Sequence, residues 1–268
     1  MTEEEKSEHA RESEQSASDA AEVASSYPEE PRFFSAVSAP AKRFMQNAWA
    51  IAGTSPELFI LQSAGGDAEL AVKDISAWRG NSDLPVAGFD LPGSNDEALA
   101  KLKAIFAGHD QSDTVSVRLG AGEQIARARE LTEAAASQLG DGDNMLLVYE
   151  LESDDAPACL AQTADRGVIL PAMNERPTDT ASYARRFARI ASERSGKKKC
   201  AEFNPEAVYL LLSYDWPRGY RQIQEVVTQA VKSSGRDEPV SVDLLQQAMG
   251  LESAQIASPD TRLSVLMK

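Results

Sequence analysis

Short apolar runs alternate with amphipathic segments along the chain from about residue 33 to residue 172. The apolar runs are bounded by Gly and Pro, as buried strands are, and they predict strands at 58–61, 84–89, 114–119, 145–149 and 168–170. The segments between them repeat apolar residues at helical spacing and predict helices at about 39–53, 67–78, 95–107 and 122–139. This alternation predicts an α/β fold, with a five-stranded parallel sheet and helices on both faces.

The pattern changes after residue 172, where every periodic segment is helical. Helices are predicted at about 178–195, 204–214, 218–233 and 241–249, with glycines at several of the ends. Residues 1–31 have almost no large apolar side chains and are predicted to be disordered. We therefore divide the chain into an acidic tail at 1–32, an α/β core at 33–172, an all-helical unit at 173–250 and a C-terminal tail at 251–268.

The formal net charge of −15 argues against a nucleic-acid-binding surface made by bulk charge. The charge is uneven, because residues 1–31 hold ten Asp or Glu against two basic residues. A basic cluster comprises Arg185, Arg186, Arg189, Arg194, Lys197, Lys198 and Lys199. We interpret this cluster as a solvated helix face and loop, with a site for an acidic partner as the alternative.

The two cysteines, Cys159 and Cys200, are far apart and have no CxxC or histidine partner. Neither a zinc site nor a disulfide framework is therefore expected, and a reducing cytoplasm fits. No apolar stretch approaches the roughly 18 residues of a membrane span. The acidic residues 3–5 also differ from the basic start of a secretory signal.

Three motifs in the second half of the chain resemble those of one protein family. WPRGYRQI at 216–223 resembles the WPGNVREL motif of the sigma-54 transcriptional activators, a branch of the AAA+ ATPases. LPAMNER at 170–176, with Asp179, is similar to the family's LPPLRER..DI segment, and FNPEA at 203–207 is similar to its F-x-P-E-A helix. The resemblance implies an AAA+ P-loop-like core followed by an all-α lid at 173–250.

The resemblance implies a role for Arg221. Pro217 cannot continue the preceding helix and biases Trp216 away from the α region, which leaves the indole free to pack in the lid core. The next helix has a buried stripe that includes Ile223, Val226 and Val227, and Arg221 points away from it. In the family this arginine reaches from the lid to the nucleotide phosphates; the alternative is an ordinary surface arginine.

The segment that aligns with the family's phosphate loop departs from the pattern. Relatives have GESGTGKE after the first strand, where backbone N–H groups and the lysine hold the phosphates. This chain has QSAGGDAE at 62–69, which places Ala68 at the lysine and Asp67 at a glycine. Opposite or like charges at about 4 Å interact by roughly 1–4 kcal/mol, so both changes weaken triphosphate binding. The degenerate nucleotide site implied by the alignment comprises Gly65, Gly66, Asp67, Ala68, Glu69 and Arg221.

The third strand departs in the same way. Relatives end it with GGTLFLDEI, whose acidic pair holds magnesium and activates water, and this chain has Arg118 and Leu119 there. Arginine does not bind a metal and leucine is no base. An alternative alignment makes 144–151 the metal-binding strand and Glu150 its acid, but it leaves no room for a further strand before residue 168.

Two further family features have no clear counterpart. Gln162 occupies one arginine-finger position, with Arg166 nearby. The segment at 105–109 resembles the start of the loop that contacts the sigma factor, but 110–113 runs directly into the third strand, so that loop is absent and His109 is interpreted as a remaining loop residue. Gly120-Ala121-Gly122 is interpreted as a tight turn, because no Lys-Ser/Thr follows.

These observations predict a catalytically degenerate AAA+ module that acts as a protein-interaction or regulatory scaffold without ATP hydrolysis. No catalytic residue, metal site or required cofactor is expected, and ATP or ADP remains the only nucleotide candidate. The expected partners are proteins, such as the transcription machinery or another AAA+ protein, with no direct DNA or membrane contact; the oligomeric state is left open. The alternatives are an ATP-binding sigma-54-dependent activator and an unrelated α/β enzyme.

Overall fold

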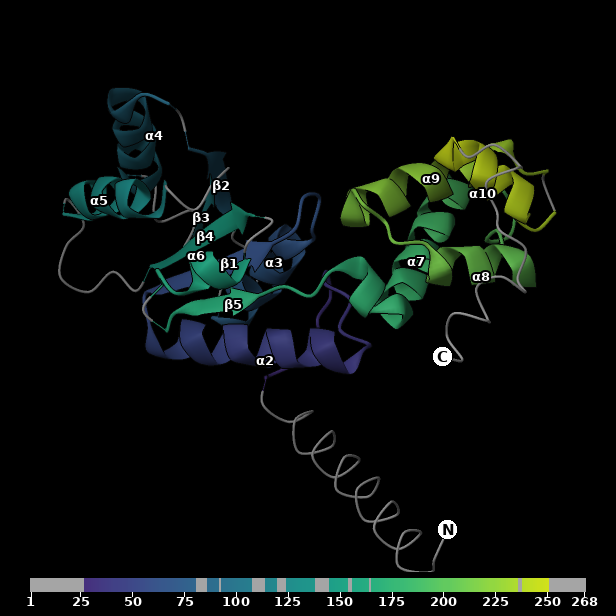
Figure 1. The fold of residues 1–268 in the computed structure, drawn as a ribbon. Coiled ribbons are helices and arrows are strands. Elements are labelled where there is room, and N and C mark those ends of the chain that lie inside the picture. The colour runs from purple at the N-terminus through teal and green to yellow at the C-terminus, as the bar shows by residue number, and fades with distance from the viewer. Residues whose placement is uncertain are drawn as a thin grey trace, which may run out of the picture. The chain divides into compact units, whose positions relative to one another are not determined.

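The computed structural model describes residues 27–80, 86–91, 93–107, 114–119, 124–137, 145–153, 156–163, 165–235 and 238–250 (Figure 1). The chain divides into two compact units between Arg176 and Pro177. The sequence placed this boundary at 172/173, four residues earlier. Each unit is described below by itself. No helix in the described ranges is long and apolar enough to cross a membrane.

The first unit is built on a parallel sheet. Its described strands are β1 (Glu57–Gln62), β2 (Ala87–Asp90), β3 (Thr114–Leu119), β4 (Leu146–Glu152) and β5 (Gly167–Ile169). They are ordered β2-β3-β4-β1-β5, and each pair of neighbours runs parallel. All five predicted strands are confirmed. The parallel arrangement brings the carboxyl ends of β1, β3 and β4 to one edge of the sheet.

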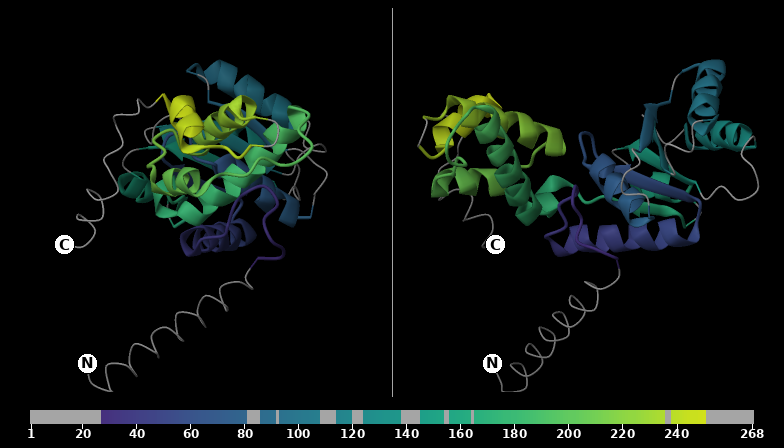
Figure 2. Two further views of the ribbon diagram at one scale, coloured as in Figure 1. Left: turned by 90° about the vertical axis from the view of Figure 1, so that its right-hand side faces the viewer. Right: turned by 180° about the vertical axis from the view of Figure 1, so that it is seen from behind.

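Helices cover both faces of this sheet, as predicted (Figures 1 and 2). Helices α2 (Ala39–Thr54) and α3 (Ala68–Trp78) pack on one face. On the other face, α4 (Asn95–Ala107) and α5 (Ile125–Ala136) bury Leu102, Phe106 and Ile125 against Phe59 and Tyr149 of the strands. The short helix α6 (Ala156–Leu160) was not predicted, because it is too brief to give a periodic signal.

The second unit is helical, as predicted. It contains α7 (Pro177–Arg194), α8 (Pro205–Ser213), α9 (Gly219–Ser233) and α10 (Val242–Met249). Asn204 caps α8 by accepting the N–H of Ala207 at 2.8 Å, with Pro205 at the first helical position. The buried core of the unit includes Tyr183, Phe187, Leu211, Ile223, Val226, Val227, Ala230, Val231 and Leu245.

The break between α8 and α9 is formed by Trp216. Its indole is buried, and Nε1 donates to the carbonyl oxygen of Leu211 at 2.9 Å, which confirms the predicted packing. The backbone differs from expectation: Trp216 has φ 50°, in the left-handed region, rather than the extended form that precedes most prolines. This conformation costs about 1–2 kcal/mol in a residue other than glycine, and burial of the indole offsets it.

The basic cluster is mostly a solvated surface, as interpreted. Arg185, Arg189 and Arg194 are exposed on α7. Lys197 has a structural role, because its Nζ donates to the carbonyl oxygens of Ser234 and Gly235, both at 3.0 Å. These carbonyls follow the last residues of α9, where a cation is favoured by the helix dipole.

Candidate functional site

The candidate site is the loop between β1 and α3. Gly65 has φ 73°, and a Cβ at Gly66 would collide with the side-chain amide of Gln62. The N–H of Gly66 donates to the carbonyl oxygen of Ser63 at 3.1 Å and closes a turn. The two glycines therefore form a tight turn, in which Gly65 has the left-handed backbone that favours glycine.

The amide groups of this loop bind other parts of the same chain. The N–H of Ala68, at the first residue of α3, donates to Oε1 of Gln62 at 3.1 Å. The N–H of Gly65 donates to Oε1 of Glu152, at the end of β4, at 3.4 Å. A helix N-terminus and its preceding loop bind anions through such amides. Here a side-chain amide and a carboxylate of the protein already accept from them.

Asp67 forms a buried ion pair with Arg176. The two side chains are 0% and 1% exposed. Arg176 Nη1 donates to Asp67 Oδ2 at 3.1 Å, and Nη2 donates to Oδ1, so the contact is bidentate. Nε of Arg176 donates to the carbonyl oxygen of Pro171 at 3.0 Å, and the guanidinium lies 5.1 Å from the ring centre of Phe34. The carboxylate of Asp67 is thus paired with a cation inside the protein.

Residues 27–36 form a strap that lies along α3. Tyr27 stacks on Trp78, at the end of α3, with ring centres 5.2 Å apart. In the middle of α3, the buried carboxylate of Asp74 accepts the backbone N–H groups of residues 32, 33 and 34 at 2.7–3.1 Å. Phe34 is 1% exposed and lies over Arg176. Residues 27–32, which we had assigned to the tail, therefore contact the core, while residues 1–26 lie outside the described ranges.

Arg118 and Leu119 lie at the end of β3, as predicted. Arg118 Nε donates to Asp90 Oδ1 of β2 at 2.6 Å. This hydrogen bond raises the pKa of Arg118 further above its usual range, although partial burial opposes the shift, so the guanidinium stays charged. Leu119 is 2% exposed and belongs to the core under α4 and α5. Neither residue can supply a metal ligand or a base.

Glu150 lies in the centre of the sheet. It is 3% exposed, pairs in register with Arg118 and Ile60, and accepts a hydrogen bond from Ser116 Oγ. The alternative that makes β4 the metal-binding strand requires another strand before β5. In the described part of the connection from Ser153 to Arg166, the chain forms α6 and no strand. No three His, Cys, Asp or Glu side chains in the described ranges are close enough to hold a metal ion.

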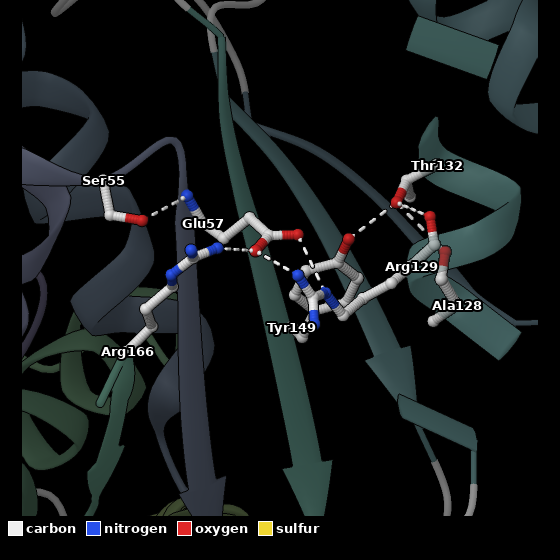
Figure 3. A network of polar contacts seen from close by, with 7 residues as sticks. All are labelled: Ser55, Glu57, Ala128, Arg129, Thr132, Tyr149 and Arg166. Atoms are coloured by element: carbon white, nitrogen blue, oxygen red, sulfur yellow. Dashed lines mark hydrogen bonds and ion pairs between the residues drawn. The ribbon is translucent and has the colours of Figure 1, made fainter. Parts of the chain in front are cut away.

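Arg166 belongs to a polar network at the amino end of the sheet (Figure 3). Its Nη1 donates to Glu57 Oε2, and Arg129 of α5 contacts both Glu57 oxygens at 3.2 Å. Beside them, the Tyr149 hydroxyl is 2.6 Å from Thr132 Oγ1, and burial raises the pKa of Tyr149. Arg166 therefore ties β1 to the start of β5, at the sheet edge opposite the Gly65–Ala68 loop. Gln162, which the alignment placed at one arginine-finger position, is exposed.

Five of the six predicted nucleotide-site residues lie together in the loop and the first turn of α3. They are Gly65, Gly66, Asp67, Ala68 and Glu69. The sixth, Arg221, is exposed on α9 of the helical unit, away from the buried stripe as predicted. Residues 108–113, with His109, and residues 120–123 lie outside the described ranges.

Two residues that define the site were missed by sequence reasoning, Arg176 and Asp74. The LPAMNER motif contained Arg176, but no local pattern indicates its pairing with a residue 109 positions away. Asp74 lies on the same α3 face as Leu70 and Ile75, where a buried acid is rare unless it is paired. An acid on the apolar face of α3 was therefore the signal that could have identified Asp74.

No known protein family matches the chain by its sequence profile, and no curated protein matches it in sequence. Solved structures match its fold. NtrX from Brucella abortus has a TM-score of 0.60 at 16% identity, over 96% of this chain and 64% of that one. The same protein in complex with ATP gives a TM-score of 0.61 at 16% identity, over 93% and 64%.

A second likeness is to domain III of the replication initiation protein DnaA from Thermotoga maritima. The TM-score is 0.52 at 13% identity, over 83% of this chain and 98% of that one. The chain spans slightly less than two thirds of the NtrX chains that it matches. At these identities the likeness concerns the fold alone, a five-stranded parallel α/β core followed by a helical unit.

Proposed function

We propose that the chain is an AAA+ module resembling those of sigma-54-interacting regulators, which has lost ATP binding and hydrolysis and acts as a protein-interaction or regulatory scaffold. One observation carries this proposal: the carboxylate of Asp67 occupies the phosphate-loop position and is bound by Arg176. The protein itself thus supplies partners for the carboxylate of Asp67 and for the N–H groups of Gly65 and Ala68.

Nucleotide binding would require several unfavourable changes at once. A triphosphate would have to displace Asp67 from Arg176 and Gln62 from the N–H of Ala68. It would then lie beside the carboxylates of Asp67 and Glu152 without the lysine that relatives provide. Like charges at this range repel by roughly 1–4 kcal/mol each. NtrX, of similar fold, has been crystallised with ADP and with ATP. The alanine at position 68 of this chain, where the aligned motif has a lysine, supports weaker binding here.

Hydrolysis would meet a second obstacle at the end of β3. Phosphoryl transfer needs a metal ion held by acidic side chains and a group that orients the attacking water. Arg118 carries a fixed positive charge that is paired with Asp90, and Leu119 is buried in the core. These side chains support the loss of the reaction independently of the loop.

An interaction role is supported by the surface of α8. Val208, Tyr209 and Leu212 are 36%, 58% and 40% exposed, and they lie within five residues of one short helix. Clustered exposed apolar side chains often mark contacts with other proteins. A fold that is retained without its chemistry fits the same role, by analogy with other folds that host several functions.

The proposal is tested by ATP turnover of the whole chain. We expect no more phosphate release from the wild type than from the Arg221→Ala variant, because the chain lacks the loop lysine and the acidic pair. Arg221 is exposed, so this substitution should leave the fold intact. Clear turnover that Arg221→Ala abolishes would show an active ATPase and overturn the proposal.

The second candidate is an ATP-binding sigma-54-dependent activator. It is favoured by the intact Gly65-Gly66 turn and by an exposed Arg221 that matches the family's motif. A pull-down from native lysate with and without ATP separates the two candidates. A scaffold retains the same partners in both conditions, whereas an activator's partners depend on the nucleotide.

A further inference from the structure

We propose that the strap, residues 27–36, is a latch that keeps the β1–α3 loop and residues 171–176 in place through Arg176. The latch is independent of nucleotide binding, since its contacts are all within the α/β unit. The strap directly follows the acidic N-terminal residues in the sequence.

The strap is attached to α3 at the last residue of the helix and at its middle. Tyr27 stacks on Trp78, which also meets Trp49 edge-on at 5.7 Å. Asp74 then binds three consecutive backbone N–H groups, a concave arrangement that suits an anion. Detaching the strap would remove these donors from a carboxylate that is 1% exposed in the intact structure. The strap is therefore held by directed hydrogen bonds as well as by ring contacts.

The far end of the strap lies on the ion pair. The ring of Phe34 covers the guanidinium of Arg176 at 5.1 Å and packs against Phe44 at 5.5 Å. Phe34 thereby helps to exclude water from the contact between Arg176 and Asp67. An ion pair of this kind is strong when it is dry and weakens when water reaches it.

Arg176 connects the loop to the junction. Its side chain binds Asp67 of the loop. Arg176 is also the last residue of the α/β unit, directly before Pro177 begins α7. Its Nε also holds the carbonyl oxygen of Pro171. Detachment of the strap would hydrate the pair, and both the loop and residues 171–176 would lose the same anchor.

Hydrogen–deuterium exchange of the full chain tests the latch. In Phe34→Ala we expect the amides of 64–70 and of 172–177 to exchange at least about tenfold faster, together with those of the strap. The matched control is Phe33→Ala, which removes the neighbouring ring that is 43% exposed and should leave both distant segments unchanged. If Phe34→Ala does not fold, Phe34→Leu keeps an apolar side chain and removes the ring.

A second variant tests the other attachment. Asp74→Asn keeps the size of the side chain and weakens its bonds to the strap amides, so the same two distant segments should exchange faster. Faster exchange confined to residues 27–36 in both variants would overturn the proposal, since the strap would then be simple packing. Faster exchange at 64–70 without 172–177 would also overturn it, because Arg176 would not couple the two segments.

Discussion

Replacing Arg176 with methionine should lower the free energy of unfolding by about 3–5 kcal/mol. The change leaves the carboxylate of Asp67, which is 0% exposed, without its cation. Water cannot solvate the charge there, and the hydrogen bond to Pro171 is lost as well. Methionine is unbranched and flexible, so it fills much of the space and limits the cavity. Urea unfolding should show a lower midpoint with an unchanged slope.

Two further variants separate the ion pair from general packing. Arg218→Met breaks an exposed pair with Glu225, whose side chains are 66% and 61% exposed, and should cost less than about 1 kcal/mol. The double variant Asp67→Leu/Arg176→Met should be more stable than Arg176→Met alone, because it removes both charges together. An Arg176→Met variant as stable as Arg218→Met would show that the pair is not formed in solution.

The double variant Asp67→Gly/Ala68→Lys should bind ATP roughly 10- to 100-fold more tightly than the wild type. Glycine at position 67 removes the carboxylate that pairs with Arg176. It is also the residue that the sigma-54 activators have at the aligned position. Lysine adds the ammonium that relatives place on the phosphates. Each favourable charge pair at about 4 Å is worth roughly 1–4 kcal/mol, and about 1.4 kcal/mol is tenfold in affinity. Isothermal titration measures the change, after circular dichroism has shown that the variant is folded.

The matched control is Asp67→Gly/Ala68→Met, which has a long neutral side chain at position 68. It should bind ATP more weakly than the lysine variant, because only the carboxylate has been removed. No turnover is expected from either variant, since Arg118 and Leu119 still replace the acidic pair. Equal affinity of the wild type and the lysine variant would mean that charge at this loop does not control binding.

The fold was largely predictable because its elements carry local signals. Apolar runs such as 58–61 between Pro56 and two glycines specify a buried strand, and the buried stripe of α9 repeats at helical spacing. The residues of the loop could also be identified from the sequence, since an aligned motif shows directly which side chain stands at each position. Element ends shifted by a few residues, as at β2, which runs from Ala87 to Asp90.

The contacts that complete the site were not predictable in the same way. The partner of Asp67 lies 109 residues further along the chain, and the strap amides lie 40–42 residues before Asp74. Only tertiary packing brings these groups together. The left-handed backbone of Trp216 has the same origin, because burial of the indole overrides the local preference of a residue before proline. The sequence identified the residues of the loop, and the structure adds the partner of Asp67.

Thermal unfolding of the wild-type chain with and without millimolar Mg·ATP tests the central claim most directly. A ligand at about 100 times its Kd stabilises the folded state by about 2.7 kcal/mol, which shifts Tm by several degrees. Because Asp67 already forms an ion pair with Arg176, we expect the two Tm values to coincide. A rise of several degrees that grows with ATP concentration would contradict the account.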